Sequence, residues 1–184
     1  MVVRRCVYAL INCASIVLLG LQLSASSAYA GAPPKQLYNK TIEVRWAETS
    51  VNRRISDSER KTANYSYTRN IYVSNIGRGF SRLQWQGSGG AFTTQSAPGE
   101  NDLTNRLSFS GNTMALFERP NGAVTRRESV TFDTTFSGCS ASVQVGKSGA
   151  SPHWTGADHA EYELIEITVQ SATCAIRDGN AFAN

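Results

Sequence analysis

Apolar and polar residues alternate with a period of two along most of the chain. In the stretch 41–51, Ile42, Val44 and Trp46 fall on one face and polar residues fall on the other. This alternation is typical of a half-buried β-strand. The stretches 64–74 and 80–86 repeat the pattern with tyrosine, isoleucine, leucine and tryptophan. The chain is therefore predicted to consist mainly of strands.

Turn residues separate further strand-like stretches in the second half of the chain. Asn, Gly and Pro occur at 110–112 and 120–122, and these residues tolerate or preset the backbone angles of tight turns. Each turn lies between two strand-like stretches, which predicts consecutive hairpins. The stretches 140–146 and 161–176 close the chain with the same strand-favouring composition.

Two segments depart from this pattern. Residues 50–65 are the only helix candidate, although they lack an apolar stripe, and residues 87–102 are rich in Gly, Ser and Pro, which predicts a long loop. About eight strands separated by turns predict an all-β fold. We expect a single antiparallel β-barrel or β-sandwich, with little or no helix in the mature chain.

Residues 1–30 have the layout of a secretory signal peptide. Arg4 and Arg5 precede an apolar stretch, and Ala28 and Ala30 form an A-x-A cleavage pattern. Cleavage there would leave one all-β domain over 31–184, exported to the periplasm or the medium. No later segment approaches the about 20 apolar residues of a transmembrane helix, so we expect no membrane anchor after cleavage.

Removal of the signal peptide changes both the charge and the cysteine count. The 18 Lys and Arg residues against 14 Asp and Glu become 16 against 14 without Arg4 and Arg5. The remaining basic residues are scattered, so we expect no nucleic-acid partner. Cys139 and Cys174 are the two cysteines left, and an oxidising compartment predicts one disulfide between them. This bridge would tie a hairpin or two neighbouring strands.

Both histidines lie in the segment 151–163, between two predicted strands. His153, His159 and Glu161 could share a metal ion only if the chain folds back between them, because six residues of strand span about 20 Å. The same segment offers candidate catalytic residues, namely His153, Asp158, His159 and Glu161. Their spacing matches no established motif, and we expect no cofactor.

Carboxylates alternate with apolar residues at the start of the last stretch. Glu161 and Glu163 share a parity with Ile167, whereas Tyr162 and Leu164 make the opposite parity apolar. The pattern leaves open which parity faces inward, and a β-bulge could change the register.

Trp154 lies in the same segment and could either stack on a ligand or close the end of the barrel or sandwich, whereas Trp46 and Trp85 are expected in the core.

We expect a non-catalytic module that binds an unknown small molecule, glycan or protein through loops at one end. Two alternatives stay open. One is a metal-dependent or carboxylate-based enzyme with its site in 151–163. The other is a self-associating surface protein whose open sheet edges pair.

Overall fold

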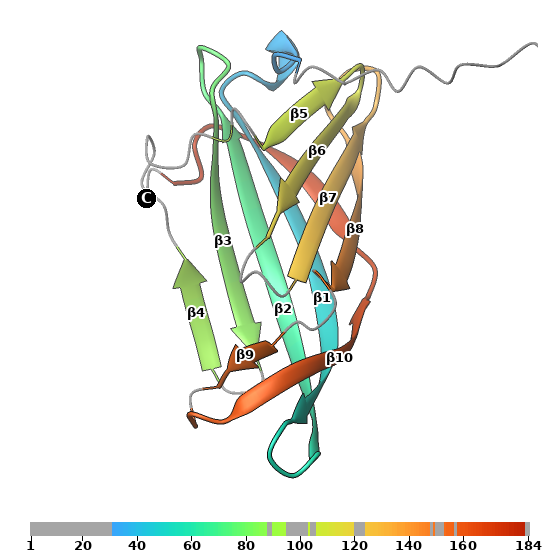
Figure 1. Cartoon of the computed structure of the whole chain (residues 1–184). Helices are drawn as coiled ribbons and strands as arrows, with labels where there is room; N and C mark the ends of the chain where they lie inside the picture. Colours follow the sequence, from blue (N-terminus) through green and yellow to red (C-terminus); the bar gives the residue numbers. More distant parts are fainter. Residues whose placement is uncertain are drawn as a thin grey trace, which may run out of the picture.

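Two antiparallel β-sheets make up the fold in a computed structural model of the chain (Figure 1). The structure describes residues 31–87, 90–94, 103, 106–119, 124–147, 149, 153–156 and 158–182, with the backbone alone for 90–94. The predicted signal peptide lies outside the described residues. Within them the only helix is the 3-10 turn η1 (Lys35–Leu37), and the rest is mainly strand, which confirms the all-β prediction.

The larger sheet has seven strands and curls into a half-barrel (Figure 1). Its strands are hydrogen-bonded in the order β4-β3-β2-β1-β10-β9, and β11 pairs with β1 as well. The strands are β1 (Lys40–Arg54), β2 (Arg60–Val73), β3 (Gly79–Gly87), β4 (Gly90–Thr94), β9 (His153–Thr155), β10 (Glu161–Val169) and β11 (Thr173–Asp178).

The smaller sheet lies over the upper part of the larger one as drawn in Figure 1. Its order is β5-β6-β7-β8, and its strands are β5 (Leu107–Ser110), β6 (Thr113–Glu118), β7 (Val124–Phe132) and β8 (Cys139–Lys147). The described residues thus form more strands than the roughly eight predicted. The additional ones are β4 and β9, and the predicted stretch 161–176 divides into β10 and β11.

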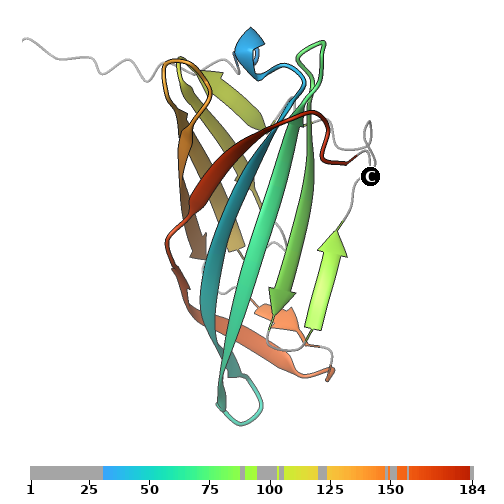
Figure 2. The same cartoon turned by 180° about the vertical axis from the view of Figure 1, so that it is seen from behind.

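β1 is the strand around which the larger sheet is organised. It pairs with β2 along nearly its whole length. On its other edge, the first half pairs with β11 and the second half with β10. Figure 2 shows β11 beside the upper part of β1 and β10 turning away below it. One long strand therefore joins the upper and lower halves of the molecule.

A β-bulge in β10 resolves the ambiguous parity of this segment. Val51 pairs with Glu166 and Asn52 with Leu164, so Ile165 has no partner of its own. Before the bulge Tyr162 and Leu164 are buried, and after it the inward parity changes so that Ile167 packs beside Leu164. The bulge considered from the sequence is confirmed, and it places Glu161 and Glu163 on the outer side.

The helix considered for residues 50–65 is wrong, because this segment forms the hairpin between β1 and β2. Arg54 donates its amide to the carbonyl of Glu59, and the strand pairing continues on both sides of the turn. Ser50 and Asn52 are buried in alternation, which is a period of two and not of 3.6. Within the predicted loop 87–102, Gly87 ends β3 and residues 90–94 form β4, and the remaining residues lie outside the described ones.

The apolar core fills the upper half of the space between the sheets. Both sheets contribute to it. Its fully buried members include Ile42, Val44, Ile71, Val73, Met114, Leu116, Val130 and Phe132. Each such side chain contributes roughly 1.5–3 kcal/mol on burial, so this half supplies most of the stabilisation by apolar burial.

The disulfide predicted between Cys139 and Cys174 is present, with the two Cα atoms 5.6 Å apart. It connects β8 of the smaller sheet to β11 of the larger one. Of the two alternatives from the sequence, the hairpin is wrong. The bridge joins strands that are neighbours across the two sheets, because the intervening chain returns along β1 and brings β11 opposite β8. The bridge ties one side of the two sheets together. Among the described residues, no helix is long and apolar enough to cross a membrane.

Because the disulfide joins the two sheets, its loss should loosen their packing. Replacing both cysteines by serine (C139S/C174S) should lower the free energy of unfolding by roughly 4 kcal/mol, the value that chain entropy assigns to a loop of this length. Urea denaturation of the oxidised proteins measures this difference. Reducing agent should destabilise the parent chain and leave the double variant unchanged. Equal sensitivity of both to reductant would contradict the assignment.

The turn between β7 and β8 is organised by one aspartate. Asp133 accepts hydrogen bonds from the backbone amides of Thr135 (2.9 Å), Ser137 (3.0 Å) and Gly138 (2.7 Å). These bonds lower the pKa of Asp133 to about 2. The amide of Ser137 makes the largest contribution, and the hydroxyls of Thr135 and Ser137 contribute less. The ionised carboxylate thus stabilises the turn that precedes Cys139.

This low pKa predicts a specific acid sensitivity. The folded-state pKa of Asp133 is below the unfolded value of about 3.9, so its stabilisation is complete above pH 4 and is lost as the pH falls towards 2. D133N should remove this part of the pH dependence and should be less stable than the parent at pH 7. Urea midpoints between pH 2 and 6 report both effects. Parallel pH profiles for parent and variant would refute the role of Asp133.

Candidate functional site

A layer of charged side chains crosses the interior below the apolar core. Its fully enclosed members are Glu48 (3 % exposed), Arg69 (2 %), Arg126 (4 %) and Glu128 (1 %). An uncompensated buried charge costs several kcal/mol, so such residues persist only when they are paired. We call these four residues and Glu118 the charge layer.

The first pair of the charge layer joins the middle of β1 to β7. The guanidinium of Arg126 donates two hydrogen bonds to Glu48 Oε1, from Nη2 (2.9 Å) and from Nε (3.1 Å). The indole N–H of Trp46 donates to the same oxygen at 2.7 Å. Arg126 also lies over the ring of Tyr67, 4.6 Å from its centroid, and Tyr67 stacks on Trp46 at 4.9 Å. The Arg126 cation is therefore held by a carboxylate and by aromatic faces together.

The second group of the charge layer joins β2 to β6 and β7. Arg69 Nε donates to both oxygens of Glu128, at 3.0 and 3.2 Å, and its terminal nitrogens bind Glu118. Burial raises the pKa of Glu128, and the nearby Glu118 adds to this, while Arg69 opposes it. Burial alone would lower the pKa of Arg69, but the two carboxylates raise it above its ordinary value. Arg69 thus stays charged and serves two carboxylates at once.

The charge layer was not predicted from the sequence, although the alternation of residues along the strands contains its signal. Arg126 and Glu128 lie on the same parity of β7 as Val124, Val130 and Phe132, all of them buried. Glu48 and Arg69 likewise continue the apolar parities of β1 and β2. Charged residues at apolar strand positions indicate an interior network, provided that partners of opposite sign occur on a facing strand.

Three aromatic side chains cover the inner face of the larger sheet beside the charge layer, and we call them the aromatic face. They are Tyr65, Tyr67 and Trp85, each half-buried. The ring of Tyr65 lies edge-on to Trp85 at 6.0 Å and 6.2 Å from Tyr67. The prediction that Trp46 lies in the core is confirmed, whereas Trp85 faces inward but retains contact with solvent.

Gly87 explains how the ring of Tyr65 is accommodated. A Cβ atom at position 87 would lie 2.5 Å from Cε1 of Tyr65, so the ring lies directly across the glycine. Burial is the largest cause that raises the pKa of Tyr65 and of Tyr67, and the carboxylate of Glu48 raises both further. Their hydroxyls are therefore neutral hydrogen-bonding groups over the whole physiological range.

No protein-family model, curated protein or solved structure matches this chain. The chemistry of the inner face is therefore the basis on which a function is assigned. The described side chains of this face provide aromatic surfaces, neutral hydroxyls and charges that are already paired.

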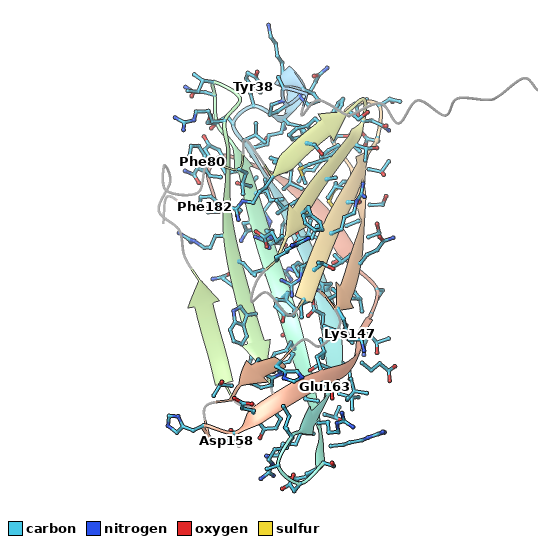
Figure 3. All side chains as sticks on the ribbon, in the orientation of Figure 1. Tyr38, Phe80, Lys147, Asp158, Glu163 and Phe182 are labelled. Carbon is cyan, nitrogen blue, oxygen red and sulfur yellow. A yellow bond between two sulfur atoms is a disulfide. The ribbon has the colours of Figure 1, made fainter. Side chains whose placement is uncertain are left out.

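Trp154 closes the lower end of the inner face. It stacks on Tyr162, with ring centroids 4.9 Å apart, and its indole N–H donates to Asn52 at 3.2 Å. The hydroxyl of Tyr162 donates to Asp158 at 2.7 Å, and this bond lowers the pKa of Asp158. Figure 3 shows Asp158 and Glu163 together at this end, opposite Tyr38. Of the residues singled out from the sequence, Trp154 and Asp158 are thus brought together through Tyr162.

The histidines are not brought together. His153 is exposed on β9, opposite Glu163 of β10, and His159 is exposed in the turn between these strands, with a φ of 59°. Glu161 pairs with Thr155. Across the described ranges, no group of three or more His, Cys, Asp or Glu residues is arranged to hold a metal ion. His153, His159 and Glu161 therefore do not form a common site in this structure.

The outer face of the larger sheet carries a shallow hollow of about 370 Å³. It is lined by Ala47, Glu48, Thr49, Asn64, Tyr65, Ser66, Gln86, Gly87 and Gln170. Thr49 and Asn64 are hydrogen-bonded to each other at 2.8 Å. Because Glu48, Tyr65 and Gly87 also line this hollow, a control for binding to the inner face must use its amide side chains, such as those of Gln86 and Gln170.

The charge layer makes a testable prediction about stability. R69M should leave Glu128 buried without its hydrogen-bonded counterion and lower the free energy of unfolding at pH 7 by about 3–5 kcal/mol. The loss should shrink as the pH falls towards 5, because burial raises the pKa of Glu128 and its carboxylate can then take up a proton. Urea denaturation at both pH values measures this.

Arg106 offers a matched control, since its guanidinium lies 3.7 Å from Glu118 and its side chain is 45 % exposed. R106M should cost less than about 1 kcal/mol. A similar small loss for R69M, or a loss that does not depend on pH, would show that the charge layer is not a coupled network.

Proposed function

We propose that the protein is a non-catalytic module that binds a small ligand on the inner face of its larger sheet. One observation carries this proposal: the aromatic face keeps Tyr65, Tyr67 and Trp85 partly open to solvent, directly beside charges that are fully paired. Half-exposed aromatic rings on an inward-facing surface are typical of ligand sites in barrels and sandwiches.

The pairing of the charge layer favours binding over catalysis. A catalytic acid or base needs a proton that it can transfer to a substrate. Here the buried carboxylate of Glu48 is held by Arg126 and Trp46, and that of Glu128 by Arg69. These groups shape and support the aromatic face. An enzyme with a site in 151–163, or self-association through sheet edges, stays a prediction.

Trp154 has a supporting place in this proposal. Its contacts with Tyr162 and Asn52 close the lower end of the same inner face, so it limits the extent of the surface on which a ligand can lie. The binding surface is then the side of the larger sheet between the charge layer and Trp154.

Ligand-observed NMR with three probe classes tests the proposal. The probes are maltohexaose, naphthoate and decanoate, which are a neutral saccharide, an aromatic anion and a fatty acid. At least one should bind to the parent chain, and Y65A or W85A should weaken that binding at least tenfold, or by about 1.4 kcal/mol.

Tyr72 is the matched control because it lies on the outer face of the same strand β2, stacked on Phe80. Y72A should leave the dissociation constant unchanged. Absence of binding for all three probes, or an equal loss in Y65A and Y72A, would refute a site on the inner face.

A further inference from the structure

We infer that the ligand of the aromatic face is a neutral saccharide, an assignment that rests on the proposed function. It follows from comparing what the inner face offers with what each class of ligand requires.

An anionic ligand requires a cation with free hydrogen-bond donors. Among the described residues of the charge layer, Arg126 binds Glu48 through two nitrogens, and Arg69 binds both Glu118 and Glu128. At the charge layer an anion would have to displace a buried carboxylate, which would then lose its partner at a cost of several kcal/mol. At the lower end of the face, Lys61 donates to the Tyr162 hydroxyl at 3.0 Å and lies 3.9 Å from Asp158, so its charge is also paired. The same pairing disfavours a cationic ligand, because each carboxylate is already neutralised.

A fatty acid or another aliphatic ligand requires an open aliphatic surface. The aliphatic parts of the interior are the upper core, where Ile71, Met114 and Leu116 are 0–1 % exposed, and a smaller cluster below the charge layer, where Val124 and Leu164 are 9 % and 4 % exposed. At the level of the aromatic face, the inward side chains of β2 and β3 are instead Tyr65, Tyr67 and Trp85. The surface available to a ligand is therefore aromatic and hydroxylated.

A saccharide matches this surface in both respects. The C–H faces of a sugar ring pack on aromatic rings, and its hydroxyls exchange hydrogen bonds with neutral donors and acceptors. The aromatic face offers the phenolic hydroxyl of Tyr65, whereas that of Tyr67 is hydrogen-bonded to Glu48. On β1, Ser50 and Asn52 are buried and bonded to each other at 3.1 Å, so they support this surface from behind.

Isothermal titration of the full chain with maltohexaose, cellohexaose and chitohexaose tests the inference. At least one neutral hexasaccharide should bind, and Y65A should weaken its binding at least tenfold. G87A provides a second variant that keeps every ligand-facing side chain, because the added Cβ displaces the ring of Tyr65. It should weaken binding at least fivefold and leave the circular dichroism spectrum unchanged, so the test does not depend on whether Y65A folds.

Three outcomes would overturn the inference. If naphthoate or decanoate binds in a Tyr65-dependent way and no hexasaccharide does, the ligand class is wrong while the proposed function stands. If none of the probes binds, both fail. If a hexasaccharide binds equally to the parent and to G87A but is lost in Q86A/Q170A, the saccharide occupies the outer hollow and not the aromatic face.

Discussion

The pairing of buried charges between the two sheets is the constraint on which the rest of the interior depends. Glu48 and Arg69 belong to the larger sheet, and Arg126 and Glu128 to the smaller one, so each ion pair crosses the space between the sheets. These contacts are directional and need a fixed register on both sides, which apolar contacts do not. They also divide the interior in two. Above them lies a closed aliphatic core, and below them lie a smaller aliphatic cluster around Val124 and Leu164 and an aromatic surface that stays in contact with solvent.

The covalent and local features of the fold support this division. The disulfide between Cys139 and Cys174 ties β8 to β11 beside the upper core. At the opposite end, β10 changes its inward parity at the bulge, so that Tyr162 and Leu164 can close the interior together with Trp154. The aromatic face lies between these two fixed ends. A surface of this kind can remain open in the folded state because the stability of the protein comes from elsewhere.

Much of the fold could be predicted from the sequence, because strand alternation is a local property. The period-two pattern of 41–51 identified β1, and the two cysteines left after the predicted cleavage identified the disulfide. The sequence did not predict that this bridge joins two sheets, since strand order is not a local property. The helix candidate at 50–65 lacked an apolar stripe from the start, and the segment is the hairpin between β1 and β2. Its strand pattern was hidden because the buried residues Ser50 and Asn52 are polar. The candidate site was missed for a related reason. Glu48 and Arg126 are 78 residues apart in the sequence. A charged residue at an apolar strand position can be assigned to an interior ion pair only when the partner on the facing strand is known.

The most direct test of this account is the solvent accessibility of the inner tryptophans, because it needs no ligand. Two variants isolate them: W46F/W154F retains Trp85, and W85F/W154F retains Trp46. Acrylamide should quench the fluorescence of Trp85 several times more efficiently than that of Trp46, since Trp46 is 3 % exposed and bonded to Glu48. Equal and weak quenching of both would show that the aromatic face is closed in solution, and the protein would then have no open surface on its inner side for a ligand.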